Sequence, residues 1–422
     1  MKKINLKNGI NLIIEPMLNT HSITIGVYLR AGARYEDKNG GITHLLEHIH
    51  FKELNNMTQD ELYYNMESIG STLRAITYYD MLKFSMKIRP IYLQKCVDIF
   101  KSIISTSIWK EENFEKEKGV IRNQIDEADS VFSEESIIRQ NLFGNSNLAN
   151  NIMGSKDSVD SIKLIDIITY KEKVFNKNNF IICVTGCVSK NDIEYIESQF
   201  GSILICDGEK NIPSNPSLLL FHRRPNIVFY NDSDDLLDVN ISFDIDYNKC
   251  SINELKILNC ILGEGVGSKL QKIVREKLNF TSNIFSEIEI YEDFALLHIK
   301  FSVQKKFFKE CLSYVFKTIA DLKYNITSRD LEVALPFYTE NQMFLQDDTE
   351  QINFEIAYNT LVLENVTCDF QIKNDNESIN HLMSVAKEIF THKNTSVIVF
   401  GNCNKITKKS IKEIVFCDED VV

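Results

Sequence analysis

The chain has 422 residues but only six prolines, and its basic residues are outnumbered by acidic ones. The 47 Lys and Arg against 59 Asp and Glu give a formal net charge of −12. This balance argues against a general nucleic-acid-binding protein, because such proteins present basic surfaces. It favours neutral or basic partners, although a surface charge that only maintains solubility would give the same composition.

Long apolar runs are also absent, and no stretch has the length that a membrane-spanning helix needs. Lys2 and Lys3 resemble the start of an export signal, but polar residues such as Asn5 interrupt the apolar run that should follow. The 10 cysteines are scattered, mostly inside apolar segments, and without an export signal they indicate reduced core thiols. Cys183 and Cys187 are four apart, but no second pair completes a zinc site. We therefore predict a cytoplasmic protein without a membrane span.

Histidine is sparse too, with 8 residues, yet His44 and His48 stand four apart in His44-Leu45-Leu46-Glu47-His48. Residues with this spacing lie on one face of a helix, so both imidazoles can reach one metal ion. Glu47 lies beside them, where it could polarise a water molecule on that metal. The order H-x-x-E-H is the reverse of the common zinc-binding H-E-x-x-H. A surface helix with two exposed histidines would show the same spacing.

The residues around the motif make the match more specific. They include Leu6-Lys7-Asn8-Gly9, the strand-like segment 23–27, Ala31-Gly32-Ala33-Arg34-Tyr35-Glu36, Gly40-Gly41 and Ile49-His50-Phe51-Lys52. In this order the sequence resembles the pitrilysin/insulinase family of zinc metallopeptidases (inverzincins), in its short two-domain, processing-peptidase-like branch. The resemblance recurs in pieces along nearly the whole chain.

The order of predicted elements suggests a duplication, and a chain of this length predicts at least two domains. In the first half we predict strands near 10–15, 22–30, 71–77, 80–88 and 180–184, and helices near 41–53, 58–69, 90–106, 161–175 and 189–200, with one more from residue 111. In the second half we predict strands near 227–230, 239–245, 284–290, 294–303 and 397–401, and helices near 251–262, 267–278 and 305–322. Late in each half a strand ends in glycine, at Gly186 and Gly401.

We therefore predict an α+β protein of two homologous halves, each a mostly antiparallel sheet flanked by helices. The predicted domains are 1–205, with the metal site, and 226–422, joined by a linker over 206–225 that holds three of the six prolines. The resemblance implies that two such halves form half of a clam-shell chamber. Two unrelated domains would show the same alternation of strands and helices.

A catalytic zinc site needs three protein ligands and one open position for water. The resemblance implies His44 and His48 as ligands and Glu47 as the general base of a Zn²⁺ centre. It places the third ligand, a glutamate, in a later helix with the pattern E-K-x-V-I-x-x-E-I. Here this segment reads Glu117-Lys118-Gly119-Val120-Ile121-Arg122-Asn123-Gln124-Ile125, so the ligand position holds Gln124. The resemblance gives Glu117 a supporting role behind the ligands.

Gln124 has a physical cost, because a neutral amide leaves the charge of the zinc uncompensated and should weaken its binding. Glu127 lies one turn further on, but about 60° round the helix, so it points away from the ligand line. A natural glutamine and an engineered Glu→Gln exchange would both give this sequence.

The resemblance also implies how a peptide is held. The strand that contains Arg74 and Ala75 would be an edge that pairs with an extended substrate, although relatives carry Asn where Arg74 stands. An ordinary interior strand would show the same pattern. In the second half, relatives hold the substrate with an Arg and, seven residues later, a Tyr. Here Arg275 is present, but Ser282 replaces the Tyr.

The broken Arg/Tyr pair suggests that a homologous partner subunit supplies it, in a heterodimer rather than a self-sufficient homodimer. The leading prediction is a zinc-dependent endopeptidase subunit that cleaves short unstructured peptides, by analogy leader peptides of modified peptides, in a chamber shared with that partner. The alternative is a non-catalytic peptide-binding or structural subunit of the same family, which Gln124 and Ser282 favour and the intact histidine pair opposes. An unrelated α+β protein with a chance motif is the third possibility.

Overall fold

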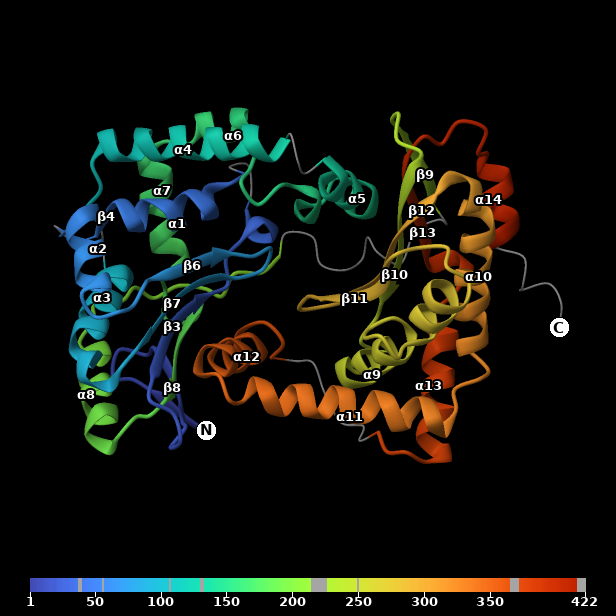
Figure 1. Ribbon diagram of the computed structural model, residues 1–422. Helices are drawn as coiled ribbons and strands as arrows, with labels where there is room; N and C mark the ends of the chain where they lie inside the picture. Colours follow the sequence, from blue (N-terminus) through green and yellow to red (C-terminus); the bar gives the residue numbers. More distant parts are fainter. Residues whose placement is uncertain are drawn as a thin grey trace. The chain divides into compact units, whose positions relative to one another are not determined.

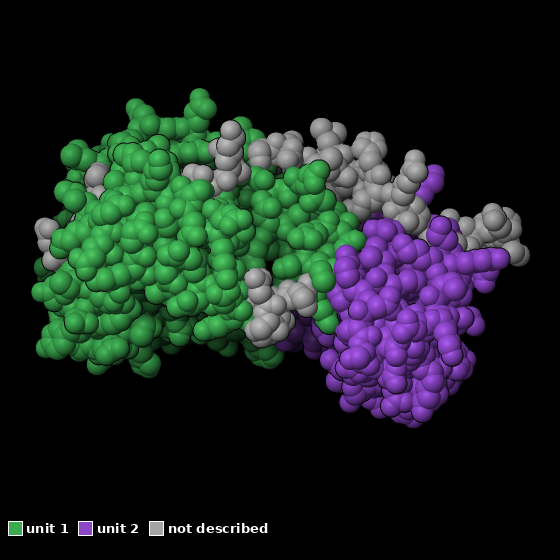
Figure 2. All heavy atoms as spheres, turned by 90° about the horizontal axis from the view of Figure 1, so that it is seen from above, with its two compact units in different colours: residues 1–215, 344–364 green, residues 216–343, 365–422 purple. Residues whose placement is uncertain are grey.

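The computed structural model describes residues 1–36, 40–54, 57–105, 108–129, 133–213, 226–248, 250–364 and 372–415. The chain divides into two compact units (Figures 1 and 2). Unit 1 comprises residues 1–215 and 344–364, and unit 2 comprises residues 216–343 and 365–422. A short segment from late in the sequence, residues 344–364, thus belongs to the unit formed by the N-terminal part of the chain.

Unit 1 contains a six-stranded sheet in the order β1-β2-β8-β3-β7-β6, in which only the pair β2–β8 is parallel. Its strands are β1 (Lys2–Asn5), β2 (Asn11–Pro16), β3 (Ile23–Leu29), β6 (Arg74–Thr77), β7 (Leu82–Ile88) and β8 (Phe180–Gly186), with a separate pair β4 (Glu53–Leu54) and β5 (Met57–Thr58). Its helices are α1 (Ile42–Lys52), α2 (Gln59–Glu67), α3 (Leu93–Ile104), α4 (Glu111–Asp129), α5 (Ser133–Phe143), α6 (Lys156–Ser161), α7 (Leu164–Val174), α8 (Lys190–Gly201) and α12 (Thr349–Leu361). Strand β6 forms one edge of this sheet.

Unit 2 contains a five-stranded sheet in the order β11-β12-β10-β13-β9, in which only β13–β9 is parallel. Its strands are β9 (Asn226–Asn231), β10 (Leu236–Ile245), β11 (Ile284–Ile290), β12 (Ala295–Gln304) and β13 (Thr395–Gly401). Its helices are α9 (Ile252–Leu262), a π-helix (Gln271–Lys277), α10 (Phe308–Leu322), α11 (Ser328–Leu345), α13 (Asn376–Ile389) and α14 (Lys408–Val415). From the parallel pair outward, the order β9-β13-β10-β12-β11 matches β2-β8-β3-β7-β6 of unit 1.

The predicted mixed fold, with two sheet-containing halves flanked by helices, is therefore confirmed. Sequence reasoning expected a helix after the strand that ends at Gly401, which is α14, but did not predict β1, β4, β5, α5, α6 or α11–α13. The predicted domain limits at 205 and 226 stay a prediction, and the compact units differ from them by placing residues 344–364 in unit 1. The predicted linker 206–225 lies within the described residues only up to 213.

Strand β3 shows how the sequence places the two layers of unit 1. Ile23, Ile25 and Val27 point into the apolar core, while the alternate residues face the helix α12. Because Gly26 lacks a side chain, α12 can approach the sheet closely, and a Cβ there would lie 2.5 Å from the side-chain oxygen of Asn353. Figure 1 shows α12 on the opposite side of this sheet from α1 and α3.

Two of the compositional predictions concern what is absent. Within the described ranges, no helix is both long enough and apolar enough to cross a membrane. Every described cysteine is a free thiol, including Cys183 and Cys187. The predicted cytoplasmic location stays a prediction.

Candidate metal centre

The start of helix α1 is fixed before the metal motif begins. Gly41 caps the helix with a φ of 89°, and a Cβ there would lie 2.4 Å from the carbonyl oxygen of Met153, so the position requires glycine. The buried carboxylate of Glu36 accepts hydrogen bonds from the backbone N–H groups of Gly41 (2.7 Å) and Thr43 (2.9 Å). These groups have no partner within the helix, so Glu36 anchors its first turn. Burial raises the pKa of Glu36, and these hydrogen bonds offset part of that effect.

One face of α1 is buried and determines where the opposite face points. Leu45, Leu46 and Ile49 are fully buried in the core. His50 is also fully buried, and its ring packs against Phe84, with 5.1 Å between the ring centroids. His50 is thus a core residue, whereas the motif residues on the other face remain partly accessible.

The two motif histidines lie side by side, and one of them contacts the predicted third ligand. The ring centroids of His44 and His48 are 4.6 Å apart. Nε2 of His44 lies 3.3 Å from Oε1 of Gln124 on α4. The side chains of His44 and His48 are only 15% and 17% exposed. Two helices that are distant in the sequence therefore bring an imidazole pair and an amide oxygen together.

Glu117 contacts the other histidine from the same face of α4. Its Oε2 lies 3.1 Å from Nδ1 of His48, and its Oε1 lies 3.4 Å from Nζ of Lys52. Burial raises the pKa of Glu117, but the contacts with His48 and Lys52 outweigh it, so the pKa lies below its usual value. A carboxylate on Nδ1 orients a ring whose Nε2 is left for a metal ion.

Glu47 occupies the space between the histidines and the edge of the sheet. Its Oε2 accepts a hydrogen bond of 2.5 Å from Oγ1 of Thr77 on β6 and lies 3.6 Å from Nδ1 of His44. Burial raises the pKa of Glu47, but interactions with His44, Thr77 and His48 outweigh it, so the pKa lies below its usual value. The carboxylate is therefore held ionised beside the imidazoles.

One pair of donor atoms has the spacing that a tetrahedral zinc ion requires. Zinc–ligand bonds of 2.0–2.1 Å place two donor atoms about 3.3 Å apart, which is the separation of Nε2 of His44 and Oε1 of Gln124. Within the described residues, no group of three or more His, Cys, Asp or Glu side chains could hold a metal ion. The centre thus has two imidazoles and an amide, and lacks the third ionisable ligand. Glu127 is exposed.

The predicted substrate-binding residues lie on β6 and in unit 2, and both arginines among them form ion pairs with nearby carboxylates. Arg74 is exposed on the edge strand β6 and forms an ion pair of 2.9 Å with Glu350 of α12, and Ala75 follows it on the same strand. In unit 2, Arg275 lies in the π-helix and pairs with its neighbour Glu276 at 3.1 Å, while Ser282 is exposed.

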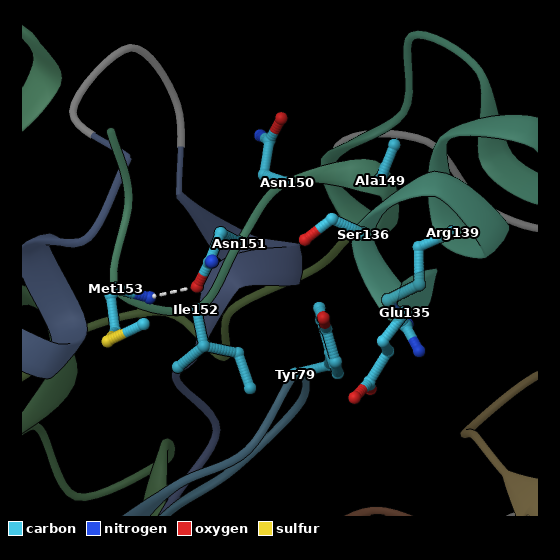
Figure 3. A pocket seen from close by; sticks show the side chains of 9 residues that line it. All are labelled: Tyr79, Glu135, Ser136, Arg139, Ala149, Asn150, Asn151, Ile152 and Met153. Atoms are coloured by element: carbon cyan, nitrogen blue, oxygen red, sulfur yellow. Dashed lines mark hydrogen bonds between the residues drawn. The ribbon is translucent and has the colours of Figure 1, made fainter. Parts of the chain in front are cut away.

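Unit 2 shows what this fold contains without a metal motif. Helix α9, which follows β10 as α1 follows β3, carries Lys256, Asn259 and Cys260 on the wall of a cavity of about 490 Å³. Asn259 accepts a hydrogen bond of 2.6 Å from Ser286 of the edge strand β11. A second cavity, in unit 1, measures about 180 Å³ (Figure 3), and none of the predicted site residues lines it.

Three residues that contact the site residues or the start of their helix were not predicted: Glu36, Lys52 and Thr77. Lys52 and Thr77 lie in stretches that the resemblance covers, but nothing in a local pattern tells which side chain meets Glu117 or Glu47. Glu36 could have been found from its place before the glycines that start the helix.

Comparison with known proteins gives a consistent picture. Residues 12–156 match a family described as Insulinase (Peptidase family M16), and residues 161–363 match one described as Peptidase M16 inactive domain. An uncharacterised zinc protease of Bacillus subtilis, YmxG, is 24% identical over 93% of this chain and 96% of its own length. The mitochondrial-processing peptidase subunit beta of Saccharomyces cerevisiae is 29% identical, over 47% of this chain and 44% of its own.

Solved structures share the fold over almost the whole chain. The peptidase M16 inactive domain from Pseudomonas fluorescens superposes with a TM-score of 0.82 at 14% identity, covering 95% of this chain and 98% of its own. A protease from Helicobacter pylori superposes with a TM-score of 0.78 at 20% identity, covering 95% of this chain and 99% of its own.

Proposed function

Because the chain belongs to the pitrilysin/insulinase (M16) family of zinc metallopeptidases, we propose that it is a zinc-dependent endopeptidase subunit that cleaves short, unstructured peptides. The observation that carries the proposal is the approach of Nε2 of His44 to Oε1 of Gln124 at 3.3 Å, with Glu47 beside them. This geometry is what a shared metal ion requires of two of its ligands.

The residues around the centre then have separate roles. His44, His48 and Gln124 hold the zinc, which when bound lowers the pKa of a water molecule and polarises the peptide carbonyl. Glu47 takes the proton from the attacking water as general base and passes it to the leaving amine. Glu117 orients His48 through Nδ1, and Lys52 holds Glu117.

The edge strand β6 supports the choice of substrate. A peptide that adds to this edge offers its backbone to the strand and needs no particular side chain, but it must be extended. Ala75 would pair with that backbone, and Arg74 would meet a substrate side chain. Folded proteins would be excluded, whereas leader peptides of modified peptides are short and unstructured enough to bind.

The remaining role, holding the substrate through an Arg/Tyr pair, would fall to a partner subunit. Arg275 is present, but Ser282 stands where relatives carry a Tyr, so we propose that a homologous subunit supplies the Arg/Tyr pair in a heterodimer and closes the chamber. One relative is itself named as a subunit of a processing peptidase. A homodimer would leave both sites without the Tyr.

The non-catalytic alternative is less favoured, because the histidine pair and Glu47 are intact and the full-length relative is named a zinc protease. Gln124 supports it only to the extent that a neutral ligand binds zinc weakly. Zinc content therefore separates the two functions.

The test is the variant Gln124→Glu, compared with the unmodified chain for zinc content by mass spectrometry and for cleavage of an unstructured peptide library, with and without the homologous partner subunit. We expect zinc affinity and cleavage to rise by about tenfold or more, because an anionic ligand compensates the metal charge. Glu47→Gln should abolish cleavage with the fold and zinc content retained. Unchanged zinc content in Gln124→Glu would remove residue 124 from the ligand set, and cleavage by Glu47→Gln would remove Glu47 as the base.

A further inference from the structure

The carboxylate of Glu47 is held at one of its two oxygens. Thr77 donates its hydroxyl hydrogen to Oε2 at 2.5 Å, and Nδ1 of His44 lies 3.6 Å from the same oxygen. Both contacts that the described residues make with this carboxylate therefore involve Oε2. The side chain of Glu47 is only 13% exposed, so it has little room to turn. This leaves Oε1 as the oxygen that can face a water molecule.

The donor itself is rigid. Thr77 ends strand β6, where it pairs with Leu82, and its residue is 8% exposed. The turn that follows is closed by the N–H of Tyr78 donating to the carbonyl of Met81 at 2.8 Å. The next carbonyl, that of Tyr79, accepts a hydrogen bond of 2.9 Å from the N–H of Arg34. A β-branched side chain on a backbone fixed in this way has few accessible rotamers.

Resting on the proposed function, we propose that Thr77 is a positioning residue for Glu47. Its hydroxyl holds Oε2 and thereby presents Oε1 to the attacking water. Because Thr77 belongs to the edge strand on which the peptide would lie, it also fixes the distance between the base and the bound backbone. Reaction geometry of this kind is sensitive to displacements of about 1 Å.

Unit 2 offers a comparison for the hydrogen bond between Thr77 and Glu47. There Ser286 of the edge strand β11 donates to Oδ1 of Asn259 on α9 at 2.6 Å, between elements that correspond to β6 and α1. In register Ser286 corresponds to Ala75 and not to Thr77, so the two units share a hydroxyl contact from the edge strand to the helix but not its position. Of these two contacts, only the one in unit 1 ends on a carboxylate, which can accept a proton.

The experiment compares Thr77→Val, which removes the hydroxyl at nearly constant shape, with Thr77→Ser, which keeps it. The full zinc-loaded chain, with and without Gln124→Glu, is assayed on an internally quenched unstructured peptide mixture, both alone and combined with the homologous subunit that carries the Arg/Tyr pair. We expect Thr77→Val to lower kcat about 10- to 100-fold, with KM and zinc content within twofold of the parent. Thr77→Ser should stay within threefold in kcat.

Two matched controls separate positioning from stability. Thr339→Val makes the same change at an exposed residue of helix α11, which carries none of the proposed site residues. Ser286→Ala removes the hydrogen bond between the edge strand and α9 in unit 2. We expect both to leave kcat unchanged, even if Ser286→Ala lowers the melting temperature as much as Thr77→Val does. If Thr77→Val keeps its kcat within twofold, or if Thr77→Ser loses as much as Thr77→Val, the hydroxyl does not position the base.

A second readout does not depend on activity. Crystal structures of the parent and Thr77→Val should show the Glu47 carboxylate displaced in the variant, with the His44 and His48 rings unmoved. A carboxylate that stays in place overturns the proposal about Thr77. Absence of cleavage in every variant even with the homologous subunit present, with the displacement observed, instead overturns the proposed peptidase function.

Discussion

The side chains of Tyr28 and Asn353 are joined by a hydrogen bond of 2.6 Å across 325 residues of sequence. Tyr28 lies on the central strand β3, and Asn353 on helix α12. The amide of Asn353 also donates to the carbonyl of Cys183 at 3.0 Å and to the hydroxyl of Thr185 at 3.1 Å. A late segment of the chain is therefore bound to unit 1 by buried polar contacts.

Replacing Asn353 by alanine should destabilise unit 1. The change leaves several buried groups of β3 and β8 without a partner, at a cost of about 2–4 kcal/mol in the free energy of unfolding. Urea denaturation followed by circular dichroism measures the loss. Asn359→Ala, at an exposed position on the same helix, should cost less than about 0.5 kcal/mol. Equal effects of the two variants would mean that α12 is not held by this amide.

Glu36 should affect zinc affinity without binding the metal, because it anchors the first turn of α1. Glu36→Ala removes the acceptor for two N–H groups at the start of α1, and we expect a loss of about 2–3 kcal/mol in stability. Zinc affinity, measured by competition with a chelator, should fall about tenfold, because the first turn carries His44. Glu36→Gln retains an acceptor, so its stability and zinc affinity should lie between those of the parent and of Glu36→Ala. Zinc affinity that is unaffected by Glu36→Ala would show that the helix is held by its packing alone.

The stability of the protein should depend on Lys171, a buried residue whose Nζ donates to the carbonyl of Ser105 at 2.7 Å. Burial lowers the pKa of Lys171 from 10.5 to about 7. Between these values the unfolded chain binds the proton and the folded chain does not, so the unfolding free energy rises as pH rises from about 7 toward 10. The contribution, on the order of 5 kcal/mol, is complete above the unfolded pKa and is lost as pH falls to the folded one.

The variant Lys171→Met isolates this effect. Relative to the parent, its unfolding free energy should lack the rise between pH 7 and 10, measured by urea denaturation at several pH values. Lys173→Met, at an exposed position on the same helix, should keep the rise. If all three proteins show the same slope, Lys171 is charged in the folded state at neutral pH.

Arg74 should affect peptide selection more than stability. Its ion pair with Glu350 is largely exposed on the side of the arginine, so Arg74→Asn should cost less than about 1 kcal/mol. Binding of labelled peptides to the Glu47→Gln chain, measured by fluorescence anisotropy, should shift a few-fold away from acidic side chains in Arg74→Asn and further in Arg74→Glu. Identical preferences in all three proteins would place Arg74 outside the peptide path.

Local patterns accounted for much of the fold and for the composition of the site. The spacing of His44 and His48 follows from helical periodicity, and the alternation in β3 and β7 follows from strand periodicity, whereas Gln124 was identified only through the family resemblance. These signals lie within single elements, so the sequence carries them directly.

Contacts between distant elements could not be predicted in the same way. Thr77 and Glu47 are 30 residues apart, and nothing in either stretch indicates that the hydroxyl meets the carboxylate. The placement of α12 in unit 1 depends on the buried amide of Asn353 and on the missing side chain of Gly26, which have meaning only when both layers are present. Sequence reasoning assigned residues 344–364 to the second domain for this reason.

The late return of the chain to unit 1 has a consequence for gene fission. A polypeptide cut between residues 215 and 226 gives a first fragment that lacks the helix covering its sheet, while the second fragment carries it. The two fragments, co-expressed with separate tags, should reassemble and co-purify, and the first alone should be insoluble or unfolded. Because the later part of the chain supplies a helix to the sheet of unit 1, the folding of unit 1 should depend on the second fragment.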